Sequence, residues 1–161
     1  MKRILIVLAL VAMVIMPIAA RGNFSVGLEA GQPSGVTFGY QINDKIDVYL
    51  TGAFGFGSRN FVDEVIGAQY KVTSFSIKGI DFDVLAGAQV GAAQYFKNDT
   101  MGGGVALVAR ATGAVAYNWT WEKVGDFTAY LRAGIGARFG LSGEAKTGLS
   151  WNAALGCVYH F

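Results

Sequence analysis

Residues 151–161, Trp-Asn-Ala-Ala-Leu-Gly-Cys-Val-Tyr-His-Phe, decide the fold of this chain because their odd and even positions differ in character. One face carries Trp151, Ala153, Leu155, Cys157, Tyr159 and Phe161. The other carries small or polar residues such as Asn152, Gly156 and His160. A period of two is typical of a β-strand with two unlike faces. Two aromatic rings at one level suit a lipid–water boundary better than a dry core, so the stretch predicts a membrane strand.

The start of the chain has the pattern of a secretory signal peptide. Lys2 and Arg3 precede the apolar run 4–16, and the small residues Ala19 and Ala20 follow. A run of about thirteen apolar residues is shorter than the roughly twenty that a spanning helix needs, which disfavours a membrane anchor. We expect residues 1–20 to be a signal peptide cleaved after Ala20, with Ala19 as the alternative site, and 21–161 to be one mature domain.

The composition of residues 21–161 narrows the class of protein. Removing Lys2 and Arg3 leaves eleven basic and eleven acidic residues of the 13 and 11 in the full chain, and this neutral balance argues against a nucleic-acid partner. The single cysteine, Cys157, has no partner for an internal disulfide. Outside the signal, no stretch of eighteen apolar residues occurs. A hydrophobic exported chain without such a stretch satisfies its backbone in a membrane by forming a closed barrel.

Alternating segments recur along the chain at the spacing that a barrel needs. The expected strands are 24–30, 36–42, 46–56, 72–78, 82–95, 105–121, 127–141 and 151–161, and the longer loops are 57–71, 97–104 and 142–148. The predicted fold is therefore all-β, an eight-stranded antiparallel up-and-down transmembrane β-barrel. An even number of strands places both ends of the barrel domain on the same side of the membrane.

Glycines indicate which face of the strands points inward. Most strand glycines, such as Gly27, Gly87 and Gly136, share the polar face. The interior of an eight-stranded barrel is just wide enough for side chains, so glycine there relieves crowding. The alternative is a soluble, lipocalin-like barrel with the bulky apolar face turned inward around a ligand.

Charged side chains on the inward face predict a network across the lumen. Its members are Glu29, Asp47, Asp83, Arg110, Arg132 and Arg138. Buried charges must be paired or hydrated, and we expect Glu29 and Arg132 to lie at similar depth and form the centre of a plug. The alternative is an ion path, for which eight strands leave little room.

Aromatic residues are expected to gather at two heights, as in membrane barrels. The predicted girdle at the end with short turns contains Tyr117, Trp119, Trp121 and Phe127, together with Tyr159 and Phe161. The opposite group is Phe54, Phe56, Tyr95, Phe139 and Trp151.

Little in the sequence points to catalysis or to a cofactor. His160 is the only histidine, and with Cys157 it does not make a zinc set. A catalytic histidine would need a nucleophile and an orienting acid within reach, so we predict no catalytic, metal-binding or cofactor-binding residues.

The cleaved signal, the eight alternating strands and the ending with Gly156, Tyr159 and Phe161 resemble the small outer-membrane barrels of Gram-negative-type bacteria, a class that includes OmpX-like, OmpW-like and OmpA transmembrane domains. The resemblance implies an integral outer-membrane protein surrounded by outer-membrane lipids. It also implies insertion by periplasmic chaperones and the barrel-assembly machinery, with Gly156, Tyr159 and Phe161 as the assembly signal. The implied function is a non-enzymatic surface scaffold for envelope integrity or adhesion, with an unknown extracellular ligand. The alternatives are a narrow OmpW-like channel and a lipid-modifying enzyme.

Overall fold

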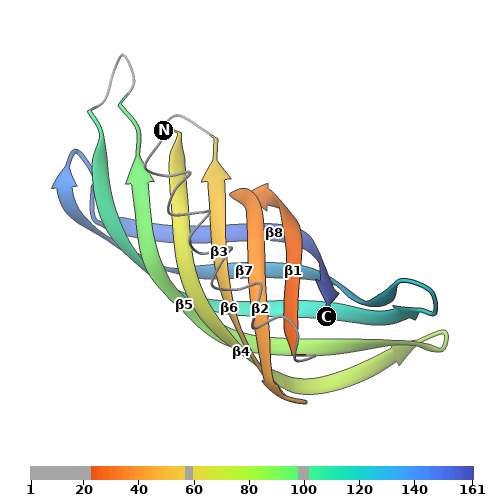
Figure 1. Ribbon diagram of the computed structural model, residues 1–161. Helices are drawn as coiled ribbons and strands as arrows, with labels where there is room; N and C mark the ends of the chain where they lie inside the picture. The colour runs from red at the N-terminus through yellow and green to blue at the C-terminus, as the bar shows by residue number, and fades with distance from the viewer. Residues whose placement is uncertain (1–22, 57–59, 98–101) are drawn as a thin grey trace.

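The computed structural model describes residues 23–56, 60–97 and 102–161, and these form a closed ring of eight strands. Every strand pairs antiparallel with its neighbours in the chain, and the last pairs with the first (Figure 1). The strands are β1 Phe24–Gln32, β2 Ser34–Asn43, β3 Ile46–Gly55, β4 Phe61–Ile77, β5 Ile80–Tyr95, β6 Gly104–Trp121, β7 Gly125–Gly143 and β8 Gly148–His160. The predicted all-β, eight-stranded up-and-down barrel is confirmed. The expected signal peptide, 1–20, lies outside the described residues.

The register of the strands fixes the tilt of the barrel wall. Cross-strand pairs lead from Tyr159 on β8 once around the ring and return to β8 at Leu149, ten residues away. The positions passed are Val26, Phe38, Leu50, Ile66, Val90, Ala109 and Ala137. A shear of ten over eight strands corresponds to a tilt of about 40°. Every residue on this path is apolar.

The strongest departure from the predicted strands is in β4. Residues 57–71 were expected to form mostly a loop and 72–78 the strand, but β4 begins at Phe61 and is 17 residues long. A register shift between Lys71 and Thr73 marks a β-bulge, which inserts one extra residue. Before the bulge the outward residues have even numbers, as in Ile66, whereas after it they have odd numbers, as in Phe75. The bulge therefore breaks the period of two that predicts a strand. Residues 57–59 of the expected loop lie outside the described part.

Of the two other expected loops, 97–104 is shifted by one residue and 142–148 is shorter than predicted. The segment between β5 and β6 separates Tyr95 from Gly104, and that between β7 and β8 separates Gly143 from Gly148. Residues 98–101 of the first are not described. In Figure 1 the β4–β5 and β6–β7 hairpins reach furthest to the right, past the C-terminal end of the chain. We call this end of the barrel, with the hairpin turns and the C-terminus, the turn end.

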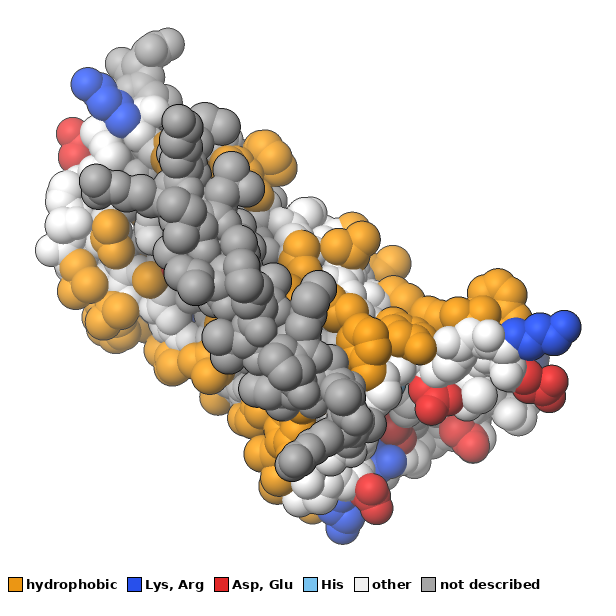
Figure 2. Space-filling view, in the orientation of Figure 1, with side chains coloured by type: hydrophobic (Ala, Val, Ile, Leu, Met, Phe, Trp, Pro, Cys, Tyr) orange, Lys and Arg blue, Asp and Glu red, His pale blue; other side chains and the backbone are white. Residues whose placement is uncertain are grey.

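The two faces of the wall have opposite character. Large apolar side chains on all eight strands are exposed outward, among them Leu28, Val36, Leu50, Ile66, Val90, Leu107, Ile135 and Leu155. Buried inward side chains are mostly polar or small, among them Glu29, Thr37, Thr51, Asp63, Gln69, Gln89, Arg110, Thr112, Arg132, Ser150 and Asn152. Figure 2 shows hydrophobic side chains along the wall and charged ones gathered toward the ends. The lipocalin-like alternative, with its apolar face inward, is therefore wrong. Within the described residues, no helix has the length and apolar character to cross a membrane.

A closed lumen and a polar vestibule

The centre of the lumen is occupied by an ion pair between Glu29 on β1 and Arg132 on β7. Both side chains are 3% exposed. The Tyr130 hydroxyl donates a 2.6 Å hydrogen bond to Glu29 Oε1, and the Arg132 guanidinium stacks 4.1 Å from the centre of the Tyr49 ring. Because Tyr49 belongs to β3, this cluster joins opposite walls and closes the cross-section.

A second ion pair fills the lumen further from the turn end, toward the opposite end of the barrel, which we call the loop end. Arg110 Nη1 lies 2.7 Å from Asp63 Oδ2, and Arg110 Nε donates to the Ser150 hydroxyl at 2.7 Å. Both charged side chains are 3% exposed. Asp63 was not among the predicted network residues because it was placed in the loop 57–71. Its alternation with Val65 and Gln69 along β4 is the signal that could have revealed it.

Neutral side chains form hydrogen bonds between the two ion pairs, and further polar contacts extend from the second ion pair toward the loop end. Tyr49 donates a hydrogen bond of 3.1 Å to Gln89 Oε1, and Gln89 Nε2 donates to Asn152 Oδ1 at 3.4 Å. Beyond the second ion pair, Arg138 donates to the Tyr95 hydroxyl at 2.8 Å and to the Lys146 carbonyl at 3.0 Å. Tyr95 therefore faces the lumen, and its predicted place in the outer aromatic group is wrong.

The six predicted charges do not form one network. Only Glu29 and Arg132 pair with each other; Arg110 pairs with Asp63, and Arg138 binds a tyrosine and a carbonyl group. Asp83 accepts instead from Lys71 Nζ, 3.3 Å away. Asp47 forms no hydrogen bond or ion pair with the described residues. Inward charges on distant strands can pair only where they lie at the same depth in the barrel. The alternation along each strand does not reveal that depth.

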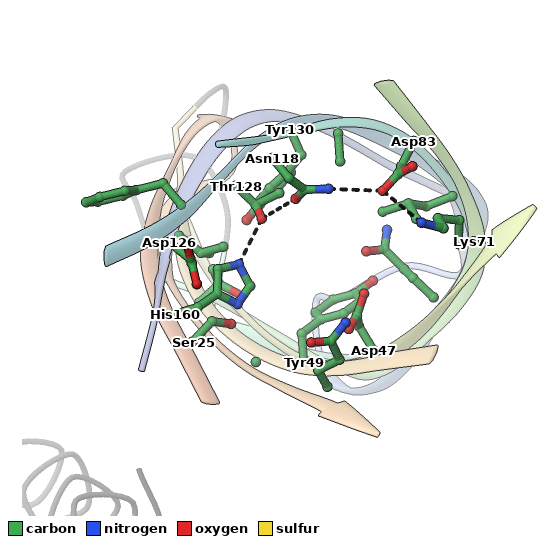
Figure 3. A pocket seen from close by; sticks show the side chains of 18 of the residues that line it. Ser25, Asp47, Tyr49, Lys71, Asp83, Asn118, Asp126, Thr128, Tyr130 and His160 are labelled. Carbon is green, nitrogen blue, oxygen red and sulfur yellow. Dashed lines mark hydrogen bonds and ion pairs between the residues drawn. The ribbon is translucent and has the colours of Figure 1, made fainter. Parts of the chain in front are cut away.

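At the turn end the lumen widens into a cavity of about 540 Å³, which we call the vestibule. Its floor is formed by Tyr49, Tyr130 and Arg132, so it stops at the central ion pair. The remaining polar residues that line it are Ser25, Thr37, Gln41, Asp44, Asp47, Gln69, Lys71, Asp83, Asn118, Thr120, Asp126, Thr128 and His160. Figure 3 shows several of these side chains converging on the open space.

A chain of hydrogen bonds crosses the vestibule wall from β8 to β4 (Figure 3). His160 Nε2 lies 2.8 Å from Thr128 Oγ1, Thr128 donates to Asn118 Oδ1 at 2.6 Å, and Asn118 Nδ2 donates to Asp83 Oδ2 at 3.0 Å. A carboxylate only accepts, so Asp83 orients the Asn118 amide, whose oxygen then takes the single Thr128 proton. His160 Nε2 must therefore donate to Thr128. This arrangement fixes the wall and leaves His160 unable to act as a base toward Thr128.

Outside the barrel, aromatic rings form a continuous arc at the turn end. Neighbouring ring centres lie 5.0 to 5.8 Å apart along the series Phe75, Phe82, Tyr117, Trp119, Phe127, Tyr159 and Phe161. Tyr117, Trp119 and Phe127 of the predicted girdle lie together in this arc. Trp121 is 61% exposed and makes no ring contact with the described residues.

The C-terminal strand has structural contacts at the residues that the resemblance marks as an assembly signal. The Phe161 backbone N–H donates to the Phe24 carbonyl at 2.9 Å, which closes the ring between β8 and β1. The Tyr159 hydroxyl donates to the Val124 carbonyl at 3.0 Å. Gly156 lies directly opposite Tyr130, whose ring occupies the space above it. Recognition by an assembly machinery stays a prediction.

These features define a class of fold: closed, eight-stranded antiparallel barrels with a polar lumen and an apolar outer wall. The chain is similar in structure to the N-terminal β-barrel domain of OprF from Pseudomonas aeruginosa, with a TM-score of 0.56 and 16% sequence identity. The match covers 87% of this chain and 98% of that domain. No family model and no curated protein sequence matches the chain.

Proposed function

We propose that this chain is an integral barrel of the bacterial outer membrane whose closed lumen makes it a scaffold for surface loops. One observation carries the membrane assignment: large apolar side chains are exposed on every strand, while charged and amide side chains are buried inside. Exposed apolar surface of this extent is unfavourable in water. It is the arrangement expected of a barrel in lipid.

The spacing of the aromatic rings supports the same assignment. Tyr159 and Trp151 are outward residues of β8, eight positions apart. With a rise of about 3.3 Å per residue and a tilt of about 40°, they differ in height by about 20 Å. The apolar band of outer-membrane barrels is roughly 25 Å tall and flanked by aromatic girdles. The rings therefore lie where the two lipid–water interfaces would be.

The packing of the lumen favours a scaffold over a channel. The vestibule supports the channel alternative, but it ends at Tyr49, Tyr130 and Arg132, and the pair of Arg110 and Asp63 follows behind. A solute would have to displace two buried ion pairs in sequence. Adhesion or envelope integrity would then be mediated by the opposite end of the barrel, where β3 connects to β4, β5 to β6 and β7 to β8.

We expect the purified chain to show no steady openings in planar lipid bilayers. Replacing all four charged residues of the two ion pairs (Glu29→Ala, Arg132→Ala, Asp63→Ala and Arg110→Ala) should produce steady openings, because the plug is then removed. A matched control, Lys71→Ala with Asp83→Asn, removes an ion pair from the wide vestibule and should leave the lumen closed. Steady conductance by the unmodified chain would support the channel instead.

The role of Phe161 is tested by deleting it and following assembly in a Gram-negative host. We expect the full chain to appear in the outer-membrane fraction as a band that shifts on heating in a detergent gel, and the deletion to lose most of that band. Trp121→Ala removes another turn-end aromatic and should retain most of it. If both variants lose the heat-shifted band equally, Phe161 acts only as an aromatic anchor at the membrane interface. If aqueous buffer extracts the full chain, membrane insertion is contradicted.

A further inference from the structure

The vestibule contains two buried hydrogen-bond donors that no described residue satisfies. Gln69 is 8% exposed and Arg132 is 3% exposed, and both line the cavity. Gln69 Nε2 and Arg132 Nε have no hydrogen-bond partner. Buried donors are nearly always paired in folded proteins. Both donor atoms are themselves buried, so an acceptor atom in the vestibule reaches one of them when the side chain turns toward the cavity.

The charge of the vestibule calls for a cationic molecule. Asp44, Asp47, Asp83 and Asp126 line it, against Lys71 and an Arg132 that is already paired with Glu29. No cluster of His, Cys, Asp or Glu in the described residues has the geometry to hold a metal ion. An organic cation is therefore the better match to the vestibule.

The contacts single out Asp47 among these acids. Asp83 is satisfied by Lys71, Ser74 and Asn118. Asp47 makes no such contact and lies directly opposite Gln69 in the register of β3 and β4. Opposite residues in antiparallel strands have Cβ atoms about 5 Å apart. A carboxylate without a hydrogen bond and an amide donor without an acceptor thus stand side by side on one wall, with Lys71 close enough to interact with the charge of Asp47.

We propose that the vestibule binds the amino terminus of a short peptide, with its ammonium group at Asp47 and its first carbonyl oxygen at the Gln69 amide. The ammonium supplies the positive charge, and the adjacent carbonyl supplies the acceptor. A free amino acid fits less well because its carboxylate would add a negative charge to a cavity that four aspartates line. The volume of about 540 Å³ lies within the range of small-molecule sites. With the opposite end of the barrel at the cell surface, as the proposed scaffold requires, the mouth of the vestibule faces the periplasm.

The test is calorimetric titration of the full chain, folded in detergent micelles, with trialanine amide. We expect saturable binding, and binding at least about tenfold weaker for N-acetyl-trialanine amide, which lacks the ammonium group. Propylamine carries the same single charge without a carbonyl group and should also bind at least about tenfold more weakly. Asp47→Asn should weaken the binding of trialanine amide by about tenfold or more, and Gln69→Leu should weaken it by about fivefold.

Asp81→Asn is the matched control, since it removes the same charge from the β5 hairpin tip outside the vestibule, and it should change the affinity by less than about twofold. Each variant is checked by its heat-shifted gel band, and the comparison of peptides needs no variant at all. The site is refuted by no saturable binding, by equal binding of the acetylated peptide or of propylamine, or by equal effects of Asp47→Asn and Asp81→Asn. A closed or a conducting lumen leaves this result unchanged, so the proposal stands apart from the scaffold function.

Discussion

Replacing Arg132 with alanine is expected to lower the free energy of unfolding by about 3–5 kcal/mol. The substitution leaves the Glu29 carboxylate buried in the lumen with the Tyr130 hydroxyl as its remaining partner, and an uncompensated buried charge is strongly destabilising. Glu29→Ala should cost a similar amount because it isolates the guanidinium instead. Urea titration of the folded chain in lipid vesicles, followed by tryptophan fluorescence and the gel shift, measures both.

Two further variants decide whether the loss arises from the broken pair. The double variant Glu29→Gln with Arg132→Met removes both charges at similar volume, and it should be less destabilised than the sum of its single variants. Lys71→Ala breaks a pair whose lysine side chain is 36% exposed, so it should cost less than about 1 kcal/mol. An Arg132→Ala cost as small as that of Lys71→Ala would show that the central pair is hydrated and does not plug the lumen.

Gly156→Val is expected to destabilise the barrel by about 3 kcal/mol. A Cβ atom at position 156 would overlap the ring of Tyr130, so the ring must move, and overpacking of this kind costs about 1–3 kcal/mol. Movement also breaks the hydrogen bond from Tyr130 to the Glu29 carboxylate, and bonds to charged groups contribute about 1.5–3 kcal/mol. The same urea titration reports the change.

The matched control for this substitution is Gly52→Val. Gly52 has open space where a side chain would be added, with nothing within 4 Å, so valine there should leave stability nearly unchanged. The double variant Gly156→Val with Tyr130→Ala should recover part of the loss because it removes the overlapping ring. Equal effects at positions 52 and 156 would mean that glycine acts in these strands only through backbone conformation.

How much the sequence predicts can be judged strand by strand. The seventh strand was expected at 127–141 and spans Gly125–Gly143, because its alternation is unbroken. The first half of β4 was missed because the bulge near Val72 inverts the alternation and because charged Asp63 and Glu64 interrupt the apolar pattern. Asp63 faces the lumen and Glu64 is exposed on the outside. A stretch that contains charged residues and lacks regular alternation is interpreted as a loop until the partners of those charges on other strands are known.

The candidate site divides in the same way. The alternation of each strand predicts that Glu29 and Arg132 point inward. Their pairing was predicted because both were expected at a similar depth in the barrel. The partnership of Arg110 with Asp63, of Asp83 with Lys71, and of Arg138 with Tyr95 required the register of β4 and β5. The vestibule gave no sequence signal, because its lining residues come from all eight strands and one turn.

The sequence by itself determined the number of strands, the polar nature of the lumen and, outside the first half of β4, the face of each strand that meets the outside. These properties follow from side chains that alternate along one strand, so they need only local information. Only the tertiary structure decided which charges pair, where the lumen closes and where it widens. Those properties depend on a shear of ten residues around the ring, which brings together side chains that are far apart in the sequence and sets their depth in the barrel.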